Sequence, residues 1–320
     1  MKKIALLSSG GDAPGMNAAI RAIVRRGINK GLSVQGIQRG FAGLLNGNGF
    51  IDFEMGSVAD IIHRGGTILL TAREQGMFDA AFRKKAVKRL KEEGIEGLVV
   101  IGGDGSFQGA NALGELGIKV IGIPGTIDND INGTEQTIGF DTAVNTILDA
   151  VNRLRDTATS HERIFILEVM GRKTGYLALS AGLAGGAESI LVPEIEFDID
   201  EVCDRLMRGI ERLKAHSIIL VAEGAADVFK LNGEIKKRIK AEVRVTVLGH
   251  IQRGGSPSAV DRLMGSRMGA MAVDLLLEGK SGYFTGVVDG EIVPVLLDLC
   301  INGNKIFPDE LYKLALDLAR

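Results

Sequence analysis

Short, continuous apolar runs alternate with longer helical patterns along most of this 320-residue chain. Runs without polar alternation are typical of strands buried on both faces of a parallel sheet. Strand and helix in alternation predict an α/β protein with right-handed crossovers and helices on both sheet faces. The expected strands are residues 2–8, 32–37, 67–72, 97–103, 119–125, 164–170, 188–194, 217–224 and 243–249. The expected helices are residues 14–31, 82–94, 141–160 and 199–216.

The length favours two domains or two interleaved halves, because single cores stop growing near ~250–300 residues. With 45% hydrophobic and 24% charged residues, the composition is that of a globular protein with a large core. No long linker and no tandem repeat marks a boundary. The turn at Gly254–Pro257 is the best candidate for a chain crossing between domains.

Charge and cysteine content limit the partners and the compartment. The formal net charge of -2 gives no global reason to expect nucleic acid or a membrane, so anion binding has to come from local clusters. Cys203 and Cys300 are the only cysteines, and their spacing is not that of metal ligands. So few cysteines favour a protein of the reducing cytoplasm over a disulfide scaffold. The first apolar run is too short for a signal peptide, and no run reaches the ~18–20 residues of a membrane span.

Polar and glycine-rich motifs follow the ends of six expected strands. They are SSGGD (8–12), IGGDGS (101–106), PGTIDND (124–130), VMGR (169–172), AEG (222–224) and GHIQRGG (249–255). In open parallel sheets, ligands bind outside the carboxyl ends of the strands. Six such ends in one chain indicate a ligand site.

The first motif places Gly10 and Gly11 directly before a helix. Their N–H groups and the positive end of the helix would suit a phosphate. A tight turn with Asp12 near the N-cap is an equally good interpretation. The motif is neither G-x-G-x-x-G nor a Walker sequence.

The second motif surrounds Asp104 with three glycines and adds Ser106. One carboxylate among phosphate-binding glycines suits Mg²⁺, which binds one or two carboxylates together with substrate phosphates. The alternative is that Asp104 or Ser106 caps a helix.

The third motif carries Asp128 and Asp130 two residues apart. A solvated turn would be equally rich in such residues. A buried strand leads into the motif, however, and both carboxylates should be ionised, since aspartate has an ordinary pKa of ~3.9. Two like charges this close are best tolerated beside a metal or other cations. This pattern predicts one carboxylate for a substrate hydroxyl and one for a metal.

Basic side chains at strand ends complete the pattern. They are Arg73, Arg163, Arg172, Arg244, His250 and Arg253. Each alone could be a solvated surface cation, but together they suit a phosphorylated substrate, because arginine binds phosphate through two parallel hydrogen bonds. Glu223 could accept hydrogen bonds from sugar hydroxyls. Arg21 and Arg25, four residues apart on one helix, either favour the helix C-terminus or form an anion pocket.

Taken together, these motifs resemble the bacterial-type ATP-dependent 6-phosphofructokinases. The resemblance runs from Lys2 to the last helix. In family order it includes SGGDAPGMNAAIR, HRGGT, VVIGGDGS, PGTIDNDI, TIGFDTA, TSHER, EVMGR and VTVLGHIQRGGSP. It implies a glycolytic, Mg²⁺-dependent transferase that moves the γ-phosphoryl of ATP to the 1-hydroxyl of fructose 6-phosphate.

The resemblance implies two Rossmann-like three-layer α/β/α domains with largely parallel sheets and the active site in the cleft between them. The larger, ATP-binding domain would be residues 1–139 plus 254–304. The smaller, fructose 6-phosphate-binding domain would be residues 140–253 plus 305–320. The resemblance also implies a homotetramer built as a dimer of dimers, in which Arg163 and Arg244 would come from a neighbouring subunit.

The resemblance also implies individual roles. Asp128 would be the base, with Arg172 and Thr126 near the transferred phosphoryl group, and Asp104 and Asp130 would serve Mg²⁺. ATP would meet Gly11, Arg73, Glu74, Gly103, Asp104, Gly105 and Ser106. Fructose 6-phosphate would meet Thr126, Ile127, Asp128, Arg163, Met170, Gly171, Arg172, Glu223, Arg244, His250, Ile251, Gln252 and Arg253.

Family members regulated by ADP and phosphoenolpyruvate use a basic pocket between subunits. The matching residues are Arg21, Arg25, Asp60, Arg155, Gly186, Glu188, Arg212, Lys214 and His216. Met55 stands about where some relatives carry arginine, so we expect weaker effector binding.

Two glycines bear on the phosphoryl donor. Relatives that use pyrophosphate carry Asp at the position of Gly105 and Lys at that of Gly125. Glycine at both positions would leave room for the nucleotide, so we expect ATP.

Two other classes fit less well. A hydride-transfer enzyme would need G-x-G-x-x-G after the first strand, which is missing. A nucleotide sensor without catalysis need not keep Asp128, Asp130 and Arg172 together.

Overall fold

The computed structural model describes residues 1–319, and its chain divides into two compact units. Unit 1 contains Met1–Thr142 and Arg253–Lys305, and unit 2 contains Ala143–Gln252 and the residues from Ile306 onward. The chain therefore leaves unit 2 just before the turn at Gly254–Pro257. Among the described residues, no helix combines the length and apolar character that a membrane span requires.

Unit 1 is built on a seven-stranded sheet of order β11-β10-β5-β4-β1-β2-β3. The five strands from β10 to β2 are parallel, and the outer strands β11 and β3 pair antiparallel to them. The strands are β1 (Lys3–Ser8), β2 (Ser33–Ile37), β3 (Phe50–Phe53), β4 (Gly97–Gly102), β5 (Lys119–Pro124), β10 (Tyr283–Val288) and β11 (Glu291–Leu296).

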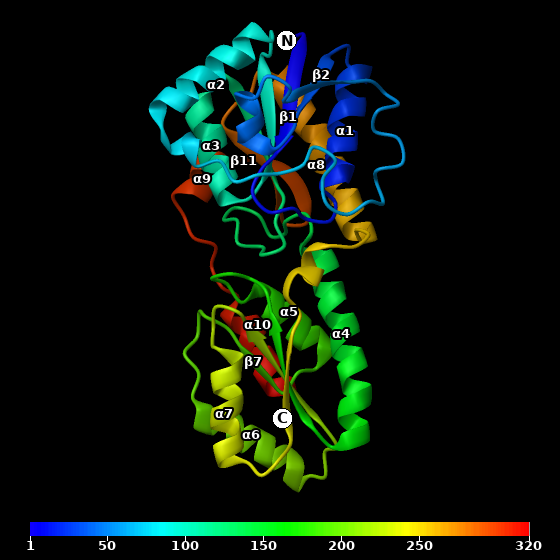
Figure 1. Ribbon diagram of the computed structural model, residues 1–320, viewed down its shortest axis with the longest axis vertical. Helices are drawn as coiled ribbons and strands as arrows, with labels where there is room; N and C mark the ends of the chain where they lie inside the picture. The colour runs from blue at the N-terminus through cyan, green and yellow to red at the C-terminus, as the bar shows by residue number, and fades with distance from the viewer. Residues whose placement is uncertain (320) are drawn as a thin grey trace. The chain divides into compact units, whose positions relative to one another are not determined.

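Helices cover both faces of this sheet (Figure 1). α1 (Met16–Asn29) and α8 (Ala259–Leu277) lie on one face, while α2 (Ala80–Glu92) and α3 (Asp104–Gly114) lie on the other. The short α9 (Leu297–Ile301) and the 3₁₀ helices η1 (Gly40–Leu44) and η2 (Gln75–Phe78) complete the unit. α1 and α8 pack closely, and Gly265 makes this possible because it has no side chain. A Cβ there would lie only 2.8 Å from the Gly15 carbonyl oxygen.

Unit 2 has a four-stranded parallel sheet of order β7-β8-β6-β9. Its strands are β6 (Ile164–Val169), β7 (Ser189–Leu191), β8 (Ser217–Ala222) and β9 (Val243–Val247), followed by the 3₁₀ helix η3 (Gly249–Arg253). Its helices are α4 (Phe140–His161), which begins in unit 1, α5 (Tyr176–Gly185), α6 (Ile199–Glu211), α7 (Val228–Arg238) and α10 (Asp309–Leu318).

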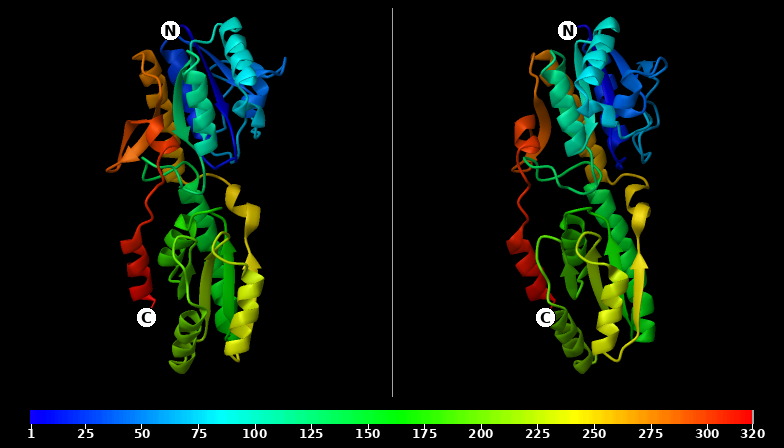
Figure 2. Two further views of the ribbon diagram at one scale, coloured as in Figure 1. Left: turned by 90° about the vertical axis from the view of Figure 1, so that its left-hand side faces the viewer. Right: turned by 60° about the vertical axis from the view of Figure 1, so that its left-hand side comes forward.

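The core of unit 2 also lies on both faces of its sheet. α6 and α7 bury Val202, Leu206 and Leu231 against one face. α5 and α10 lie on the other face (Figure 2), where the Tyr312 hydroxyl donates to the Ile190 carbonyl at 3.1 Å. The predicted α/β class with largely parallel sheets is confirmed.

The predicted strand at residues 67–72 is wrong. Its backbone groups bond to side chains and a turn rather than to a ladder: Ile68 N–H donates to Asn17 Oδ1 at 2.8 Å, and the Ser8 hydroxyl donates to the Leu70 carbonyl at 3.0 Å. Leu70 also has a φ of 59°, outside the extended region.

The predicted helix at 199–216 ends earlier, at Glu211. Arg212 is its C-cap, and Leu213 has a φ of 58°, which no α-helix can continue. Lys214 and His216 therefore lie in the connection to β8.

Candidate functional site

Three strand ends of unit 1 come together at the carboxyl edge of the sheet. Ser9 N–H, after β1, donates to the Ile101 carbonyl of β4 at 2.9 Å. Gly125 N–H, after β5, donates to the Gly102 carbonyl at 3.0 Å. The first three glycine and aspartate motifs are therefore neighbours.

The loop after β1 is shaped by an arginine from the far end of unit 1. A Cβ at Gly11 would lie 2.4 Å from Arg253 Nη1, and the same nitrogen donates to the Asp12 carbonyl at 3.3 Å. The guanidinium of Arg253 therefore lies directly against the backbone of Gly11. The N-cap of α1 is Gly15, three residues after Asp12, and no side chain bonds to the start of this helix.

The second motif forms the first turn of α3. Gly103 is the N-cap and uses no side chain, so neither Asp104 nor Ser106 is the helix cap. Asp104 is exposed and accepts from Gln108 Nε2 at 3.1 Å. A Cβ at Gly105 would meet nothing within 4 Å. The positive end of this helix, with open space at Gly105, suits a phosphate chain.

The loop after β5 is not a solvated turn. Asp128 is 2% exposed, and its N–H donates to Thr126 Oγ1 at 3.2 Å. Buried Ile127 and Ile131 flank it. Asn129 has a left-handed φ of 52° and donates through Nδ2 to the Glu135 carbonyl at 3.1 Å. Thr126 pairs with Ile138 through a 3.1 Å backbone bond, so the loop is anchored at both ends.

Asp104 and Asp130 act on the same thiol. Burial, and then the charges of Asp104 and Asp130, raise the pKa of Cys300 to about 12. Cys300 Sγ lies 4.0 Å from Asp104 Oδ1. Within residues 1–319, no group of three or more His, Cys, Asp or Glu side chains is arranged to hold a metal ion. Asp104 and Asp130 both lie near this thiol, and Mg²⁺ binds through one or two protein carboxylates together with oxygens from phosphates and water.

Gly125 differs from the expectation that it leaves room for a nucleotide. A Cβ there would lie 2.9 Å from Met16 Cε and 3.1 Å from Ile101 Cγ2. The Cα–Cβ direction at this position points into the packed core. A side chain at 125 would therefore press on Met16 and Ile101, whereas the space at Gly105 is open.

Arg73 and Glu74 lie between the 67–72 segment and η2. Arg73 is exposed, and Glu74 caps η2 by accepting from Gly76 N–H at 2.7 Å. Glu74 therefore has a local structural role.

In unit 2, the motifs after β6 and β8 and the η3 helix meet. Arg172, with a φ of 55°, donates its N–H to Glu223 Oε1 at 2.7 Å. Met170 N–H donates to Oε1 of the fully buried Gln252 at 3.2 Å. Gly171 is required here, since its φ is 132° and a Cβ would lie 2.4 Å from the Thr174 carbonyl oxygen. His250 and Ile251 of η3 are exposed.

Arg163 and Arg244 share a carboxylate that the motif analysis missed. Arg163 Nε donates to Glu242 Oε2 at 2.6 Å, and Arg244 Nη2 bonds to Glu242 Oε1. The hydrogen bond from Arg163 is the largest cause of the lowered pKa of Glu242. Glu242 lies one residue before β9, outside every motif, so the sequence did not mark it as a site residue.

Glu168 on β6 was also missed. Burial, and then the charges of Glu223 and Asp227, raise its pKa. The sequence could have indicated this residue, because Glu168 is the one carboxylate inside the apolar run IFILEVM.

Two of the predicted effector residues in unit 2, Glu188 and Lys214, are in contact, and the others bond to neighbouring residues. Arg155 bonds to the Gly185 carbonyl beside Gly186, and Lys214 forms an ion pair with the buried Glu188. His216 Nδ1 lies 2.9 Å from Thr159 Oγ1, and its pKa is lowered mainly by burial, with Arg155 and Lys214 adding to the effect. Arg212 caps α6 nearby in the chain.

The unit 1 members of that set lie apart in sequence. Arg21 and Arg25 are on α1, and Arg25 Nε is buried without a hydrogen-bond partner among the described residues. Asp60 is exposed, with a φ of 52°.

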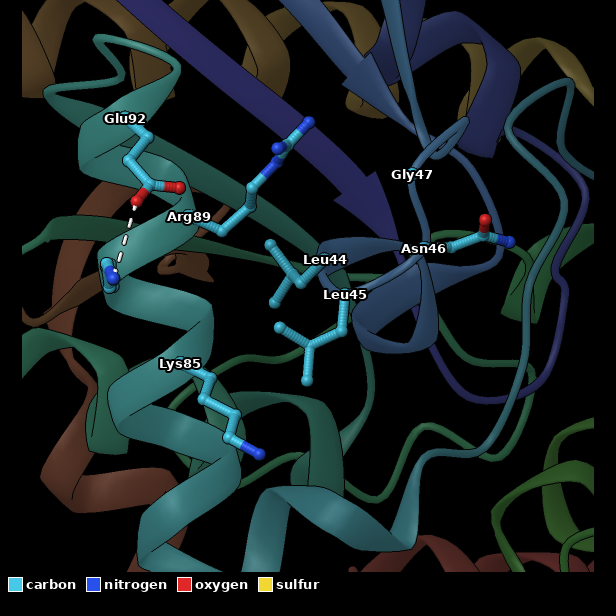
Figure 3. Close-up of a pocket in the computed structure, with 8 residues that line it drawn as sticks. Leu44, Leu45, Asn46, Gly47, Lys85, Arg89 and Glu92 are labelled. Carbon is cyan, nitrogen blue, oxygen red and sulfur yellow. Dashed lines mark ion pairs between the residues drawn. The ribbon is translucent and has the colours of Figure 1, made fainter.

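A pocket of about 230 Å³ lies between η1 and α2 and contains none of the predicted site residues (Figure 3). Two of its cations are already paired: Lys88 lies 3.7 Å from Glu92, and Arg89 lies 2.6 Å from Glu93. Arg89 also stacks over the Phe50 ring at 5.4 Å. The charges of Lys88 and Arg89 are therefore offset by carboxylates of the same helix.

Comparison with known proteins places the chain among relatives of one kind. The family model described as phosphofructokinase matches residues 3–276. The chain is 57% identical over 328 residues to a protein named ATP-dependent 6-phosphofructokinase from Halothermothrix orenii, covering 98% of each chain. It is 60% identical to one of the same name from Natranaerobius thermophilus, covering 92% of each.

A solved structure agrees with these relatives. The phosphofructokinase from Saccharomyces cerevisiae superimposes with a TM-score of 0.89 at 34% identity, and the match covers 99% of this chain and 50% of the yeast chain. The family match covers far more than half of the chain, and the relatives are similar over nearly their full length. The chain belongs to the phosphofructokinase family.

Proposed function

We propose that this chain is an ATP-dependent 6-phosphofructokinase of the glycolytic, bacterial type. It transfers the γ-phosphoryl group of ATP to the 1-hydroxyl of fructose 6-phosphate, giving fructose 1,6-bisphosphate and ADP. The names of relatives at 57% and 60% identity support this activity. The observation that carries it is the buried Asp128 beside Thr126, next to the glycine-rich start of α3.

Asp128 is the general base in this proposal. Its carboxylate takes the proton of the 1-hydroxyl as that oxygen attacks the γ-phosphorus, and the bond to the departing ADP oxygen breaks. The Thr126 hydroxyl and the Arg172 guanidinium orient and stabilise the transferred group. The Arg172 backbone is left-handed and its N–H donates to Glu223, which supports a fixed position for the Arg172 Cα and the base of its side chain.

Mg²⁺ would be held by Asp104 and Asp130 together with phosphate oxygens, and when bound it would offset the charge of the phosphates. ATP would meet Gly11, Arg73, Glu74 and residues 103–106. Arg163, Arg244, His250 and Arg253 would bind the 6-phosphate. Residues 170–172, Glu223, Ile251 and Gln252 would hold the sugar.

ADP and phosphoenolpyruvate are the proposed effectors. Their binding would be weaker than in strongly regulated relatives, because Met55 in the 53–60 segment carries no charge. Turnover at subsaturating sugar phosphate, measured with each effector, checks this: a response as strong as in strongly regulated relatives contradicts it. We also propose a homotetramer and a cytoplasmic location, the latter supported by two buried free cysteines.

The deciding experiment is a coupled assay of ATP consumption. We expect ADP to form only when fructose 6-phosphate and Mg²⁺ are both present. ATP binding without turnover would favour a nucleotide sensor, and hydride transfer to NAD would favour the dehydrogenase alternative. Turnover with pyrophosphate but not ATP would overturn the donor assignment.

A further inference from the structure

The short segment of residues 135–138 lies against the loop that carries the proposed base. Thr126 N–H donates to the Ile138 carbonyl at 3.1 Å on one side of the base. On its other side, Asn129 Nδ2 donates to the Glu135 carbonyl at 3.1 Å. The loop is therefore tied to one segment both before and after the base.

Thr137 contributes a bond from its side chain, whereas Glu135 and Ile138 contribute backbone carbonyls. Thr137 is fully buried, and its Oγ1 donates to the Thr126 carbonyl at 2.6 Å. Both backbone groups of Thr126 are thus bonded to the segment. Turning the Thr126 peptide would leave a buried hydroxyl or carbonyl without a partner, which costs free energy. The Thr137 hydroxyl therefore holds this peptide in one orientation.

The side chain of Thr126 depends on that orientation. Its hydroxyl is partly exposed and accepts from Asp128 N–H at 3.2 Å. A hydroxyl has one O–H donor besides its acceptor lone pairs, so this bond leaves Thr126 a donor for a phosphoryl oxygen. The backbone sets the direction of the Cα–Cβ bond and hence of this donor. A displacement of about 1 Å at a reacting site can cost ~10²-fold in rate.

We propose that Thr137 is a positioning residue for phosphoryl transfer: its hydroxyl, through the Thr126 carbonyl, holds Thr126 and Asp128 in their reactive arrangement. Thr137 has no exposed surface, so it acts through Thr126 rather than on the substrate. The proposal rests on the proposed function, since it takes Thr126 and Asp128 as residues that meet the reacting groups.

Two variants of Thr137 and one control test the proposal. Thr137→Val removes the hydroxyl and keeps a branched side chain of similar size, while Thr137→Ser keeps the hydroxyl. Thr134→Val is the matched control. Thr134 is also buried, and its hydroxyl donates to the Gln136 carbonyl at 2.8 Å and accepts from Val287 N–H at 2.9 Å. The control thus loses buried hydrogen bonds of the same segment but keeps the bond to Thr126.

We expect Thr137→Val to lower kcat, per folded molecule, by ~10- to 100-fold. The KM values for ATP and fructose 6-phosphate should change less, because the orientation matters most in the transition state. Thr137→Ser and Thr134→Val should keep kcat close to that of the unchanged protein. An unchanged kcat in Thr137→Val, or an equal loss in either of the other two variants, would overturn the proposal. If Thr137→Val does not fold, Thr137→Cys, whose thiol is a weak donor, replaces it under the same criteria.

Amide hydrogen exchange of the whole protein, followed by mass spectrometry, tests the anchoring without the reaction. Exchange in peptides that cover residues 125–129 should be faster in Thr137→Val and unchanged in Thr134→Val. If exchange becomes faster as expected but the unchanged protein does not phosphorylate fructose 6-phosphate, the proposed function fails and the anchoring stands. If the unchanged protein is active and Thr137→Val neither exchanges faster nor turns over more slowly, only the role of Thr137 fails.

Discussion

At the scale of single residues, the proposed base Asp128 differs from exposed site residues such as Asp104 and His250. Asp128 is almost fully buried although its motif consists mostly of turn-forming residues. Its type and place after β5 could be predicted from the sequence. Its burial could not, because the parallel pairing between Gly125 and Ile138 that closes the loop joins residues with no local signal.

Asp128→Asn should retain fructose 6-phosphate binding while kcat falls by ~10²–10⁴, the usual contribution of a general base. Such a loss corresponds to roughly 3–5 kcal/mol of a total acceleration of ~8–23 kcal/mol, so orientation and charge stabilisation must supply the rest. Steady-state kinetics and equilibrium binding of the sugar phosphate measure both quantities. Asp156→Asn, on the exposed side of α4, is the control. Near-normal turnover of Asp128→Asn would rule out its role as base.

Gly105 and Gly125, the two glycines that bear on the phosphoryl donor, should respond differently to replacement by alanine. Gly125→Ala should lower the free energy of unfolding by ~1–3 kcal/mol, because its Cβ would overlap Met16 and Ile101. Gly105→Ala should be neutral or stabilising by up to ~1 kcal/mol, since it lies in a helix with open space around it.

Urea unfolding of both variants, with the KM for ATP, checks this pair. We expect KM to rise in Gly105→Ala. A stable Gly125→Ala with a raised KM for ATP would restore the expectation that Gly125 leaves room for the nucleotide.

At the scale of elements, buried parallel strands were predicted and edge elements were not. β1, β4 and β5 read as continuous apolar runs because both of their faces are covered. β3 and β11 pair antiparallel at the edges and carry polar residues such as Asp52 and Glu291, so no such run marks them. α8 lacks a clear polar face because small residues such as Gly265 and Gly269 pack against α1.

The start of α4 depends on a carboxylate from α8. The fully buried Asp261 accepts from Gly139 N–H at 2.7 Å, from Thr142 N–H at 2.9 Å and from the Thr142 hydroxyl at 2.5 Å. Burial raises its pKa, and these bonds offset only part of the effect. The folded chain thus binds the Asp261 proton more tightly than the unfolded chain.

This sign fixes the pH dependence. The contribution of Asp261 to stability is fully present below its ordinary pKa of 3.8 and is lost as pH rises through its raised, folded value. Asp261→Asn should remove that decline. At neutral pH it should still lower the free energy of unfolding by ~1–3 kcal/mol, because an amide nitrogen would face a backbone N–H.

Urea unfolding from acid to neutral pH measures both effects of Asp261→Asn. Asp149→Asn, in an exposed pair with Arg153, is the matched control. An unchanged pH slope in Asp261→Asn would contradict the assignment.

At the scale of the whole molecule, the proposed tetramer makes a prediction that a monomeric enzyme would not. If Arg163 and Arg244 serve the site of a neighbouring subunit, two inactive variants should complement each other. Mixing Asp128→Asn with Arg244→Ser, after dissociation and reassociation, should restore part of the activity. Mixing Asp128→Asn with Arg172→Ser should not, because both residues act in the same subunit. Equal results from the two mixtures would contradict the shared site.

The carboxylate between Arg163 and Arg244 has a consequence for affinity. Glu242 already pairs with both guanidinium groups, so a phosphate that binds them competes with an anion of the protein. The net gain is then the difference between two charge-assisted contacts, not the full strength of one. In Glu242→Gln, Arg163 and Arg244 would have no carboxylate to displace when a phosphate binds. Other small anions would then compete more strongly with the phosphate for these two arginines.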